Sequence, residues 1–152
     1  MTSNPRTSFR ADLLRQIGHY SRLMRLDKPI GIWLLLWPTL WALWLAGQGQ
    51  PDQLLFAIFV AGVVIMRSAG CVLNDFADRN IDPYVERTRD RPIAAGAITP
   101  LEALTLFAGL GLIAIGLASM LNPMARRLAV VGAALTIVYP FCLLYTSDAA
   151  DE

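Results

Sequence analysis

Three carboxylates and two asparagines are concentrated in the stretch "NDFADRNID", residues 74–82. Asp75, Asp78 and Asp82 are spaced i, i+3 and i+7, which places them on one face if a helix continues through the stretch. Asn74 joins that face because it precedes Asp78 by four residues. Like charges at this spacing repel each other and destabilise a helix. The pattern therefore predicts that a cation lies beside these side chains.

The compensating cation is either a side chain or a metal ion. Arg79 follows Asp75 by four residues and can pair with it along a helix. The alternative is a hard cation, because Mg²⁺ prefers oxygen ligands and is usually held by one or two carboxylates together with substrate phosphates. The spacing alone leaves both interpretations open: a metal–phosphate site, or a solvated loop crossed by ion pairs.

Arginines lie on both sides of the carboxylate cluster. Arg87, Arg89 and Arg91 follow it in the segment "ERTRDRPIAAG", and guanidinium groups are suited to bidentate contacts with phosphate. Arg67 lies seven residues before Asn74, inside an apolar segment. A charge within a membrane span costs roughly 2.5–3.5 kcal/mol on insertion scales, so its presence indicates a functional site.

The elements that must position these residues are apolar. Of the 152 residues, 55% are hydrophobic and 16% are charged, and the mean hydropathy is +0.48, whereas soluble domains carry about 25% charged residues. A bilayer span takes about 20 helical residues, and open sheet edges are not tolerated in lipid. The sequence therefore predicts an all-α membrane protein with spans at about 30–47, 54–73, 101–121 and 128–144.

The distribution of Lys and Arg predicts an orientation. Ten of the 13 basic residues lie before the first span or in segment 74–100, whereas the loop after the first span holds none. Basic residues are retained on the cytoplasmic side, so the N-terminus and segment 74–100 are both predicted to be cytoplasmic. Residues 1–28 have an amphipathic pattern, which suits a helix on the membrane surface or an extension of the first span. The net charge of +1 gives no indication of a nucleic-acid partner.

The stretch 74–82 resembles the NDxxDxxxD motif of the UbiA superfamily of intramembrane prenyltransferases. The blocks "RLDKPIGIWLLLWPTLWALWLA", "IMRSAGCVLNDFADRNID" and "RTRDRPIAAGAIT" resemble the same family in the same order. The resemblance runs from about residue 20 to residue 141. It is closest to the branch of the family that prenylates 4-hydroxybenzoate in ubiquinone biosynthesis.

The resemblance implies a bundle of about nine transmembrane helices in the bacterial inner membrane, of which residues 29–141 supply about four. It also implies that two Asp-rich motifs bind Mg²⁺ and the diphosphate of a polyprenyl diphosphate. Loss of that diphosphate leaves an allylic cation, which the ring of 4-hydroxybenzoate attacks. Carried onto this sequence, the catalytic residues are Asp75 and Asp78. The implied Mg²⁺ ligands are Asp75, Asp78 and Asp82. The implied diphosphate-binding residues are Asn74, Arg67, Arg87 and Arg91.

Two features depart from the family pattern. After Asp90, the acidic residues are Glu102 and three within the last five positions, and none of them forms a second Asp-rich motif. Residues 142–152 include the acidic sequence "YTSDAADE", which is unlike the family, and we expect this tail to be foreign to it. We therefore expect the chain to be the N-terminal part of a prenyltransferase and to be inactive by itself.

Two other functions stay open on the sequence. The Asp motif is shared by family members that prenylate a naphthoate, homogentisate or a porphyrin, so it does not identify the acceptor. A membrane transporter or scaffold that binds ions through the cluster is the more remote alternative. A transporter is expected to place ionisable groups near the midplane and to show internal repeats, whereas these carboxylates lie at one boundary of a span.

Overall fold

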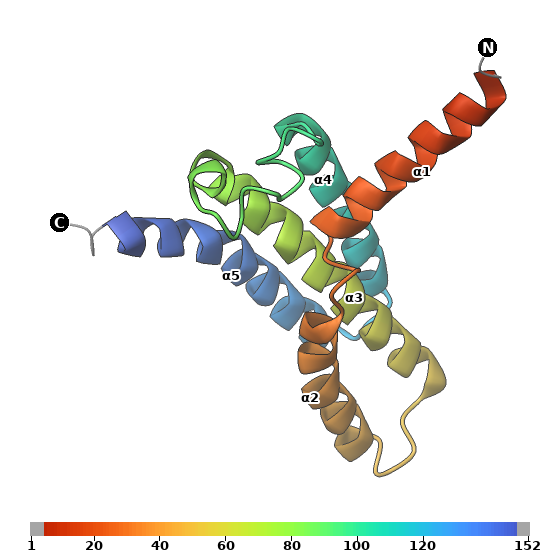
Figure 1. Cartoon of the computed structure of the whole chain (residues 1–152). Coiled ribbons are helices and arrows are strands. Elements are labelled where there is room, and N and C mark those ends of the chain that lie inside the picture. The colour runs from red at the N-terminus through yellow and green to blue at the C-terminus, as the bar shows by residue number, and fades with distance from the viewer. Residues whose placement is uncertain (1–4, 149–152) are drawn as a thin grey trace.

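The computed structural model describes residues 5–148, which form α-helices and short 3₁₀ turns with no strand among them (Figure 1). The elements in chain order are α1 (Pro5–Leu23), α2 (Ile30–Ala46), α3 (Gln53–Ala77), the turns η1 (Asp78–Asn80) and η2 (Asp82–Tyr84), α4 (Pro100–Ser119) and α5 (Pro123–Asp148). The all-α class predicted from the sequence is confirmed.

Helix α3 is the central element and packs against α1, α2, α4 and α5. It begins at the cap residue Asp52, whose Oδ1 accepts a hydrogen bond from the Leu55 backbone N–H at 2.9 Å. Helix α1 extends away from the other helices, and only its C-terminal end approaches α3 (Figure 1). The cluster of carboxylates at the end of α3 is therefore surrounded by elements from several parts of the chain.

Helices occupy all four apolar segments, and α5 is longer than the apolar pattern indicates. It begins at Pro123 rather than near residue 128 because Asn122 Oδ1 accepts a hydrogen bond from the Ala125 backbone N–H at 2.8 Å, and proline is well suited to the first helical position. Two helical stretches in the described part of the chain, Gln53–Asn80 and Pro100–Ser119, are long and apolar enough to cross a membrane. Helix α2 is apolar but shorter.

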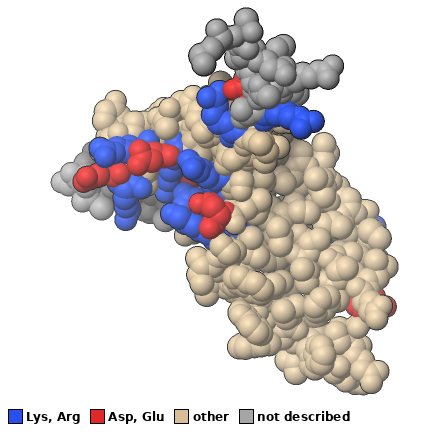
Figure 2. Space-filling view, turned by 45° about the vertical axis from the view of Figure 1, so that its right-hand side comes forward, with Lys and Arg blue, Asp and Glu red and all other residues tan. Residues whose placement is uncertain are grey.

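The surface separates into a charged end and a largely apolar remainder. Figure 2 shows Lys, Arg, Asp and Glu side chains gathered at one end, while most of the rest of that face carries no charge. Large apolar side chains on α2, α4 and α5 are exposed, among them the four tryptophans of α2. Contiguous apolar surface of this kind is what lipid or further helices cover.

A small hydrophobic core lies beneath the charged end. Its fully or nearly buried members are Leu23, Val72, Ile93, Ile98 and Ala103. They come from the end of α1, from α3, from the loop before α4 and from the first turn of α4. This packing holds the loop of residues 85–99 against α3, and the loop carries Arg91, which faces the carboxylates.

A capping box starts α4 at the end of this loop. Thr99 Oγ1 accepts a hydrogen bond from the Glu102 backbone N–H at 3.2 Å, and the Thr99 backbone N–H donates to Glu102 Oε2 at 2.7 Å. We expect Thr99→Ala to lower the free energy of unfolding by about 1 kcal/mol, because it leaves helical N–H groups without a partner. Reversible unfolding followed by circular dichroism in detergent micelles measures the change.

The matched control for this substitution is Thr105→Ala in the second turn of α4. The Thr105 hydroxyl donates to the Leu101 carbonyl at 2.8 Å and caps no helix end. Its removal is therefore expected to change the unfolding free energy by less than about 0.5 kcal/mol. Equal losses in the two variants would show that the cap does not stabilise this helix start.

Candidate functional site

The carboxylate cluster lies where α3 ends, four residues beyond the predicted span of about 54–73. The α-helix ends at Ala77, Asp78 begins η1, and Asp82 begins η2. The condition under which all three carboxylates would share one helical face, a helix that continues through Asp82, is therefore not met. Pro83 has no backbone N–H, so it cannot extend the helical hydrogen-bond ladder. The three carboxylates nevertheless converge, because the 3₁₀ turns fold the chain back toward α3.

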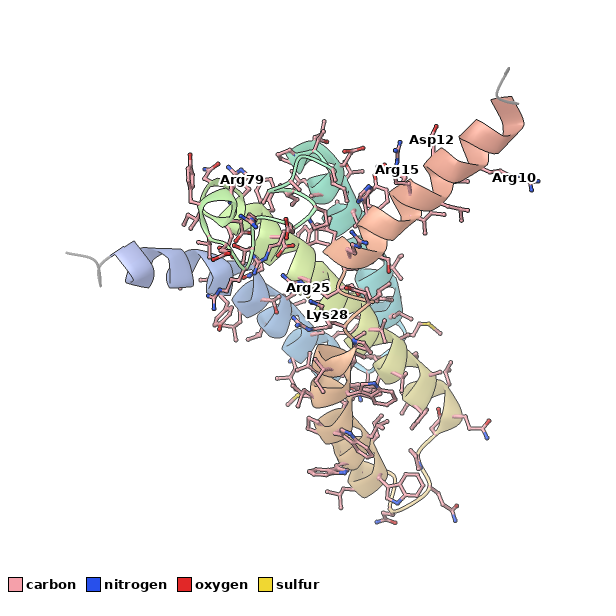
Figure 3. The ribbon with its side chains drawn as sticks, in the orientation of Figure 1. Arg10, Asp12, Arg15, Arg25, Lys28 and Arg79 are labelled. Atoms are coloured by element: carbon pink, nitrogen blue, oxygen red, sulfur yellow. The ribbon has the colours of Figure 1, made fainter. Side chains whose placement is uncertain are left out.

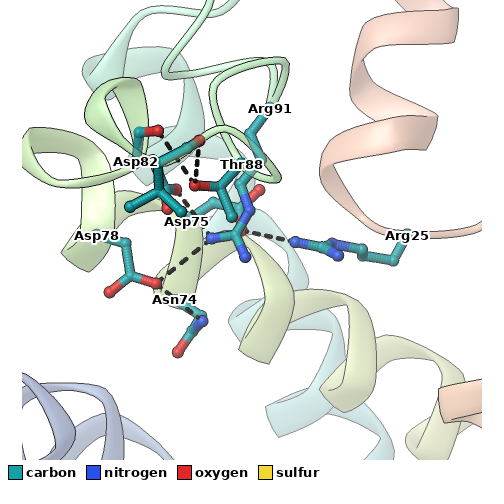
Figure 4. A network of polar contacts seen from close by, with 8 residues as sticks. Arg25, Asn74, Asp75, Asp78, Asp82, Thr88 and Arg91 are labelled. Carbon is teal, nitrogen blue, oxygen red and sulfur yellow. Dashed lines mark hydrogen bonds and ion pairs between the residues drawn. The ribbon is translucent and has the colours of Figure 1, made fainter.

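A single guanidinium group lies among the three carboxylates (Figure 4). Arg91 Nη1 is 3.2 Å from Asp75 Oδ1, 3.4 Å from Asp78 Oδ2 and 2.8 Å from Asp82 Oδ2. The cation predicted from the spacing is thus present as a side chain from the 85–99 loop.

The alternative pairing of Arg79 with Asp75 is not formed. Arg79 Nη1 donates a hydrogen bond to the Phe76 carbonyl at 2.8 Å, and its guanidinium lies 4.4 Å from the centroid of the Phe76 ring. Arg79 therefore stabilises the end of α3 locally and leaves the carboxylates to partners that come from elsewhere in the chain.

Asp75 is the most buried carboxylate of the cluster. The residue is 1% exposed, and its Oδ1 accepts a hydrogen bond from Arg25 Nη2 at 3.1 Å. Its Oδ2 is buried and has no hydrogen-bond partner among the described residues. A buried carboxylate oxygen without a partner is costly, so this atom has unused capacity to bind a cation or a donor.

Arg25 reaches Asp75 from an unusual backbone position. The Leu26 N–H donates to the Ser21 carbonyl and the Arg25 N–H to the Arg22 carbonyl, both at 3.0 Å, which is the Schellman pattern at the end of α1. Arg25 occupies the position where glycine is usual, with φ +58°. A non-glycine residue in this region is uncommon and strained. The strain accompanies a turn that directs the Arg25 side chain to α3.

Two shorter polar side chains complete the cluster. Asn74 Nδ2 donates to Asp78 Oδ2 at 3.3 Å, as its predicted place on the same face requires. The buried Thr88 hydroxyl donates to the Asp82 backbone carbonyl at 3.1 Å and ties the loop to the turn. Thr88 was not among the residues predicted from the sequence, because a single threonine in a loop carries no signal. Arg25 was not among the predicted site residues either, although it belongs to the basic run before the first span that predicted the membrane orientation.

A polar cavity of about 450 Å³ opens beside the cluster. Its basic lining residues are Arg22, Arg25, Lys28, Arg87 and Arg91. The acidic ones are Asp27, Asp75 and Asp90. The positive charge on the walls exceeds the negative charge, so the cavity suits an anion such as a phosphate group.

The remaining predicted arginines lie in different places. Arg87 is exposed and lines the cavity. Arg67 lies about two turns deeper along α3, and no ion pair joins it to any carboxylate of the cluster in the described range. Its guanidinium packs against Gly31 at the start of α2, where an added Cβ would lie 2.5 Å from Arg67 Nε. Gly31 thus makes room for this charge between α2 and α3.

The residues of the cluster fit a magnesium ion that is shared with a phosphate ligand. In the described range, no group of three or more His, Cys, Asp or Glu side chains is arranged to hold a metal by itself. Mg²⁺ needs only one or two carboxylates when substrate phosphates and water supply the other ligands. The hard oxygen donors of Asp78 and Asp82 and the unpartnered Oδ2 of Asp75 meet this requirement beside the basic cavity.

The helices and the site define a helical membrane protein with a carboxylate–arginine centre at its charged end. The model of the UbiA prenyltransferase family matches residues 35–148, three quarters of the chain. The chain belongs to this family. No solved structure matches the chain.

Curated relatives point to one branch of the family. The chain is 61% identical over 127 residues to a 4-hydroxybenzoate octaprenyltransferase of Nitrosococcus oceani, which covers 84% of this chain and 45% of the relative. It is 54% identical over 135 residues to the enzyme of that name from Coxiella burnetii, and the match covers 89% of this chain and 47% of the relative. It is 59% identical over 129 residues to the enzyme of that name from Thiobacillus denitrificans, and the match covers 85% of this chain and 44% of the relative. The chain thus spans about half the length of the curated relatives it matches.

Proposed function

We propose that this chain supplies the diphosphate-binding part of an enzyme that transfers a polyprenyl group from polyprenyl diphosphate to the ring of 4-hydroxybenzoate. One observation carries the proposal: three carboxylates converge beside a cavity with five basic side chains, at the charged end of an apolar helical protein. The names of the relatives support a polyprenyl donor and 4-hydroxybenzoate as the acceptor. We assign the reaction to ubiquinone biosynthesis from the family resemblance.

Each side chain has a proposed role in this reaction. Asp75 and Asp78 act in catalysis, and they hold Mg²⁺ together with Asp82. Bound there with the substrate, Mg²⁺ supplies positive charge that stabilises the departing diphosphate. Asn74, Arg87 and Arg91 bind the diphosphate, and Arg67 adds positive charge deeper along α3. These groups neutralise the negative charge that develops on the leaving group as the allylic carbon–oxygen bond breaks.

The apolar helices have a second task in the same reaction. The allylic cation must meet the aromatic ring before it meets water, because water would hydrolyse it. The polyprenyl chain and the cation both belong on the apolar side of the cluster, where α2, α3 and α4 carry few polar side chains. The chain thus separates a charged entrance from an apolar interior.

We also propose that the protein spans the bacterial inner membrane with its charged end on the cytoplasmic side. The Arg25–Asp75 contact brings the basic segment before α2 together with the basic segment after α3. Figure 3 shows Arg25 and Lys28 beside the junction of α1 and α2, while Arg10 and Arg15 lie on the outlying part of α1. Basic residues from both segments therefore lie at one end, as the positive-inside rule requires for a single cytoplasmic face.

An acceptor competition assay tests the proposed function. The complete protein is incubated with Mg²⁺, polyprenyl diphosphate and equal concentrations of 4-hydroxybenzoate, a dihydroxynaphthoate and homogentisate, and the products are separated by mass. Prenylated 4-hydroxybenzoate is expected to exceed each other product by at least about tenfold, because a site built for one acceptor leaves polar groups unpaired with another.

Two results would contradict this proposal. A dominant prenylated naphthoate or homogentisate would assign another acceptor. The absence of any prenylated product would contradict the enzymatic function. The 152-residue chain alone is the negative control. We expect it to give no product, because it contains no second Asp-rich motif.

A further inference from the structure

We infer that Arg91 is a built-in counter-ion that occupies the place of the metal, and that Mg²⁺ displaces its side chain toward the diphosphate in the neighbouring cavity. Arg91 then has two successive partners: the carboxylates before the metal binds, and the diphosphate afterwards. The inference rests on the proposed function for the identity of both ligands.

The charge balance of the cluster favours such an exchange. One nitrogen of Arg91 lies within 3.4 Å of oxygens from all three carboxylates. Arg25 adds a second positive charge at Asp75. Three negative charges therefore face two positive ones, and the side chains of Asp75 and Asp82 are almost inaccessible to water. Because screening by water is weak there, the residual negative charge attracts a further cation strongly.

Arg91 and a metal ion cannot occupy the cluster together. Mg²⁺ binds its oxygen ligands at about 2.0–2.1 Å, and Arg91 Nη1 now lies against one oxygen of each carboxylate that would hold the ion. The guanidinium and the metal ion would also repel each other at that distance. A divalent ion gains more from three carboxylates than a monovalent side chain does, so the side chain is the group that moves.

The structure provides both a fixed backbone and a destination for this movement. The Arg91 N–H donates to the Thr88 carbonyl at 3.0 Å, and the Ala95 N–H donates to the Arg91 carbonyl at 2.8 Å. Ile93 and Ile98 anchor the same loop in the core. The long side chain therefore rotates while the loop stays in place. The Arg91 side chain already lines the basic cavity, where it would pair with a bound anion.

Calorimetric titration with MgCl₂ tests the first half of the exchange on the purified chain in detergent micelles. Arg91→Gln is expected to bind Mg²⁺ about tenfold more tightly than the wild type, because the metal no longer displaces a partly buried ion-pair network. Arg91→Met, which keeps an unbranched apolar stem but no charge, is expected to shift the affinity in the same direction. Circular dichroism confirms that each variant keeps its helices.

Arg89→Gln is the matched control. Arg89 lies two residues away on the same loop and is exposed. The structure gives its side chain no contact with the carboxylates. The same change of charge there is expected to leave the Mg²⁺ affinity within about twofold of the wild type, because exposed charges are screened.

Inorganic pyrophosphate tests the second half of the exchange. With Mg²⁺ present at saturation, Arg91→Gln is expected to bind pyrophosphate about tenfold more weakly than the wild type, because it lacks one charged donor. The signature is therefore an inversion: tighter metal binding and weaker pyrophosphate binding in one variant.

The outcomes separate the inference from the proposed function. If helical Arg91→Gln and Arg91→Met bind Mg²⁺ no more tightly than the wild type, the inference is overturned, while the metal role of the carboxylates stands. Tighter Mg²⁺ binding with unchanged pyrophosphate affinity overturns the transfer of Arg91 to the diphosphate. If the wild type and all variants fail to bind Mg²⁺, both the inference and the proposed metal site are overturned.

Discussion

Asp78→Ala in the complete protein is expected to lower the rate of prenyl transfer by at least about 10²-fold, a loss typical for removal of one electrostatic group from an active site. Asp78 is the most accessible carboxylate of the cluster, with a side chain 27% exposed, against 2% for Asp75 and 6% for Asp82. It is therefore the carboxylate best placed to reach a metal ion that is shared with a substrate. Alanine removes its oxygens without removing a buried charge.

The control for this prediction is Asp12→Ala on the outlying part of α1. Asp12 is also exposed, and it pairs only with Arg15, at 3.0 Å, among the described residues. Its loss is expected to leave the rate near that of the wild type. Rates measured over a range of Mg²⁺ concentrations distinguish a lost metal ligand from a lost fold, because higher Mg²⁺ partly rescues only the former. A near-normal rate for Asp78→Ala at all Mg²⁺ concentrations would show that the metal role is misassigned.

Asp75→Asn is expected to lower the free energy of unfolding by about 2–3 kcal/mol, because it removes the charge from a buried group that pairs with two arginines. Arg25 and Arg91 lie 3.1 and 3.2 Å from the same Asp75 oxygen. Asparagine has nearly the same shape, so the change tests charge rather than packing. Thermal or denaturant unfolding in detergent micelles measures it, and the more exposed Asp78→Asn is expected to cost less than about 1 kcal/mol.

A double-mutant cycle separates the two arginine contacts of Asp75. The losses in unfolding free energy caused by Arg25→Gln and by Asp75→Asn are expected to be non-additive by about 1 kcal/mol, because both substitutions break the same contact. We also expect Asp75→Ala to remove activity in the complete protein. Additive losses would mean that the Arg25 contact contributes nothing. Unchanged stability of Asp75→Asn together with weaker Mg²⁺ binding would show that Asp75 acts as a metal ligand alone.

Several parts of the site were predictable because they depend on local spacing. The separation of Asn74 from Asp78 is one helical turn, and the structure joins them by a hydrogen bond. The fixed rise and period of a helix make such neighbours readable from sequence. The requirement for a cation beside the carboxylates followed from charge repulsion. Arg91 was among the candidates because arginine is suited to phosphate, but its contact with three carboxylates was not foreseen.

The sequence by itself determined the all-α class, the apolar helices and the concentration of carboxylates at one end of a helix, since each depends on residues close together in the chain. Only the tertiary structure decided that Arg25, 50 residues away, binds Asp75, and that Arg91 lies among all three carboxylates. Both contacts depend on loop paths, which are set by the left-handed turn at Arg25 and by the burial of Leu23, Ile93 and Ile98. Such packing brings together residues that no periodicity relates, and the chemistry of the cluster follows from it.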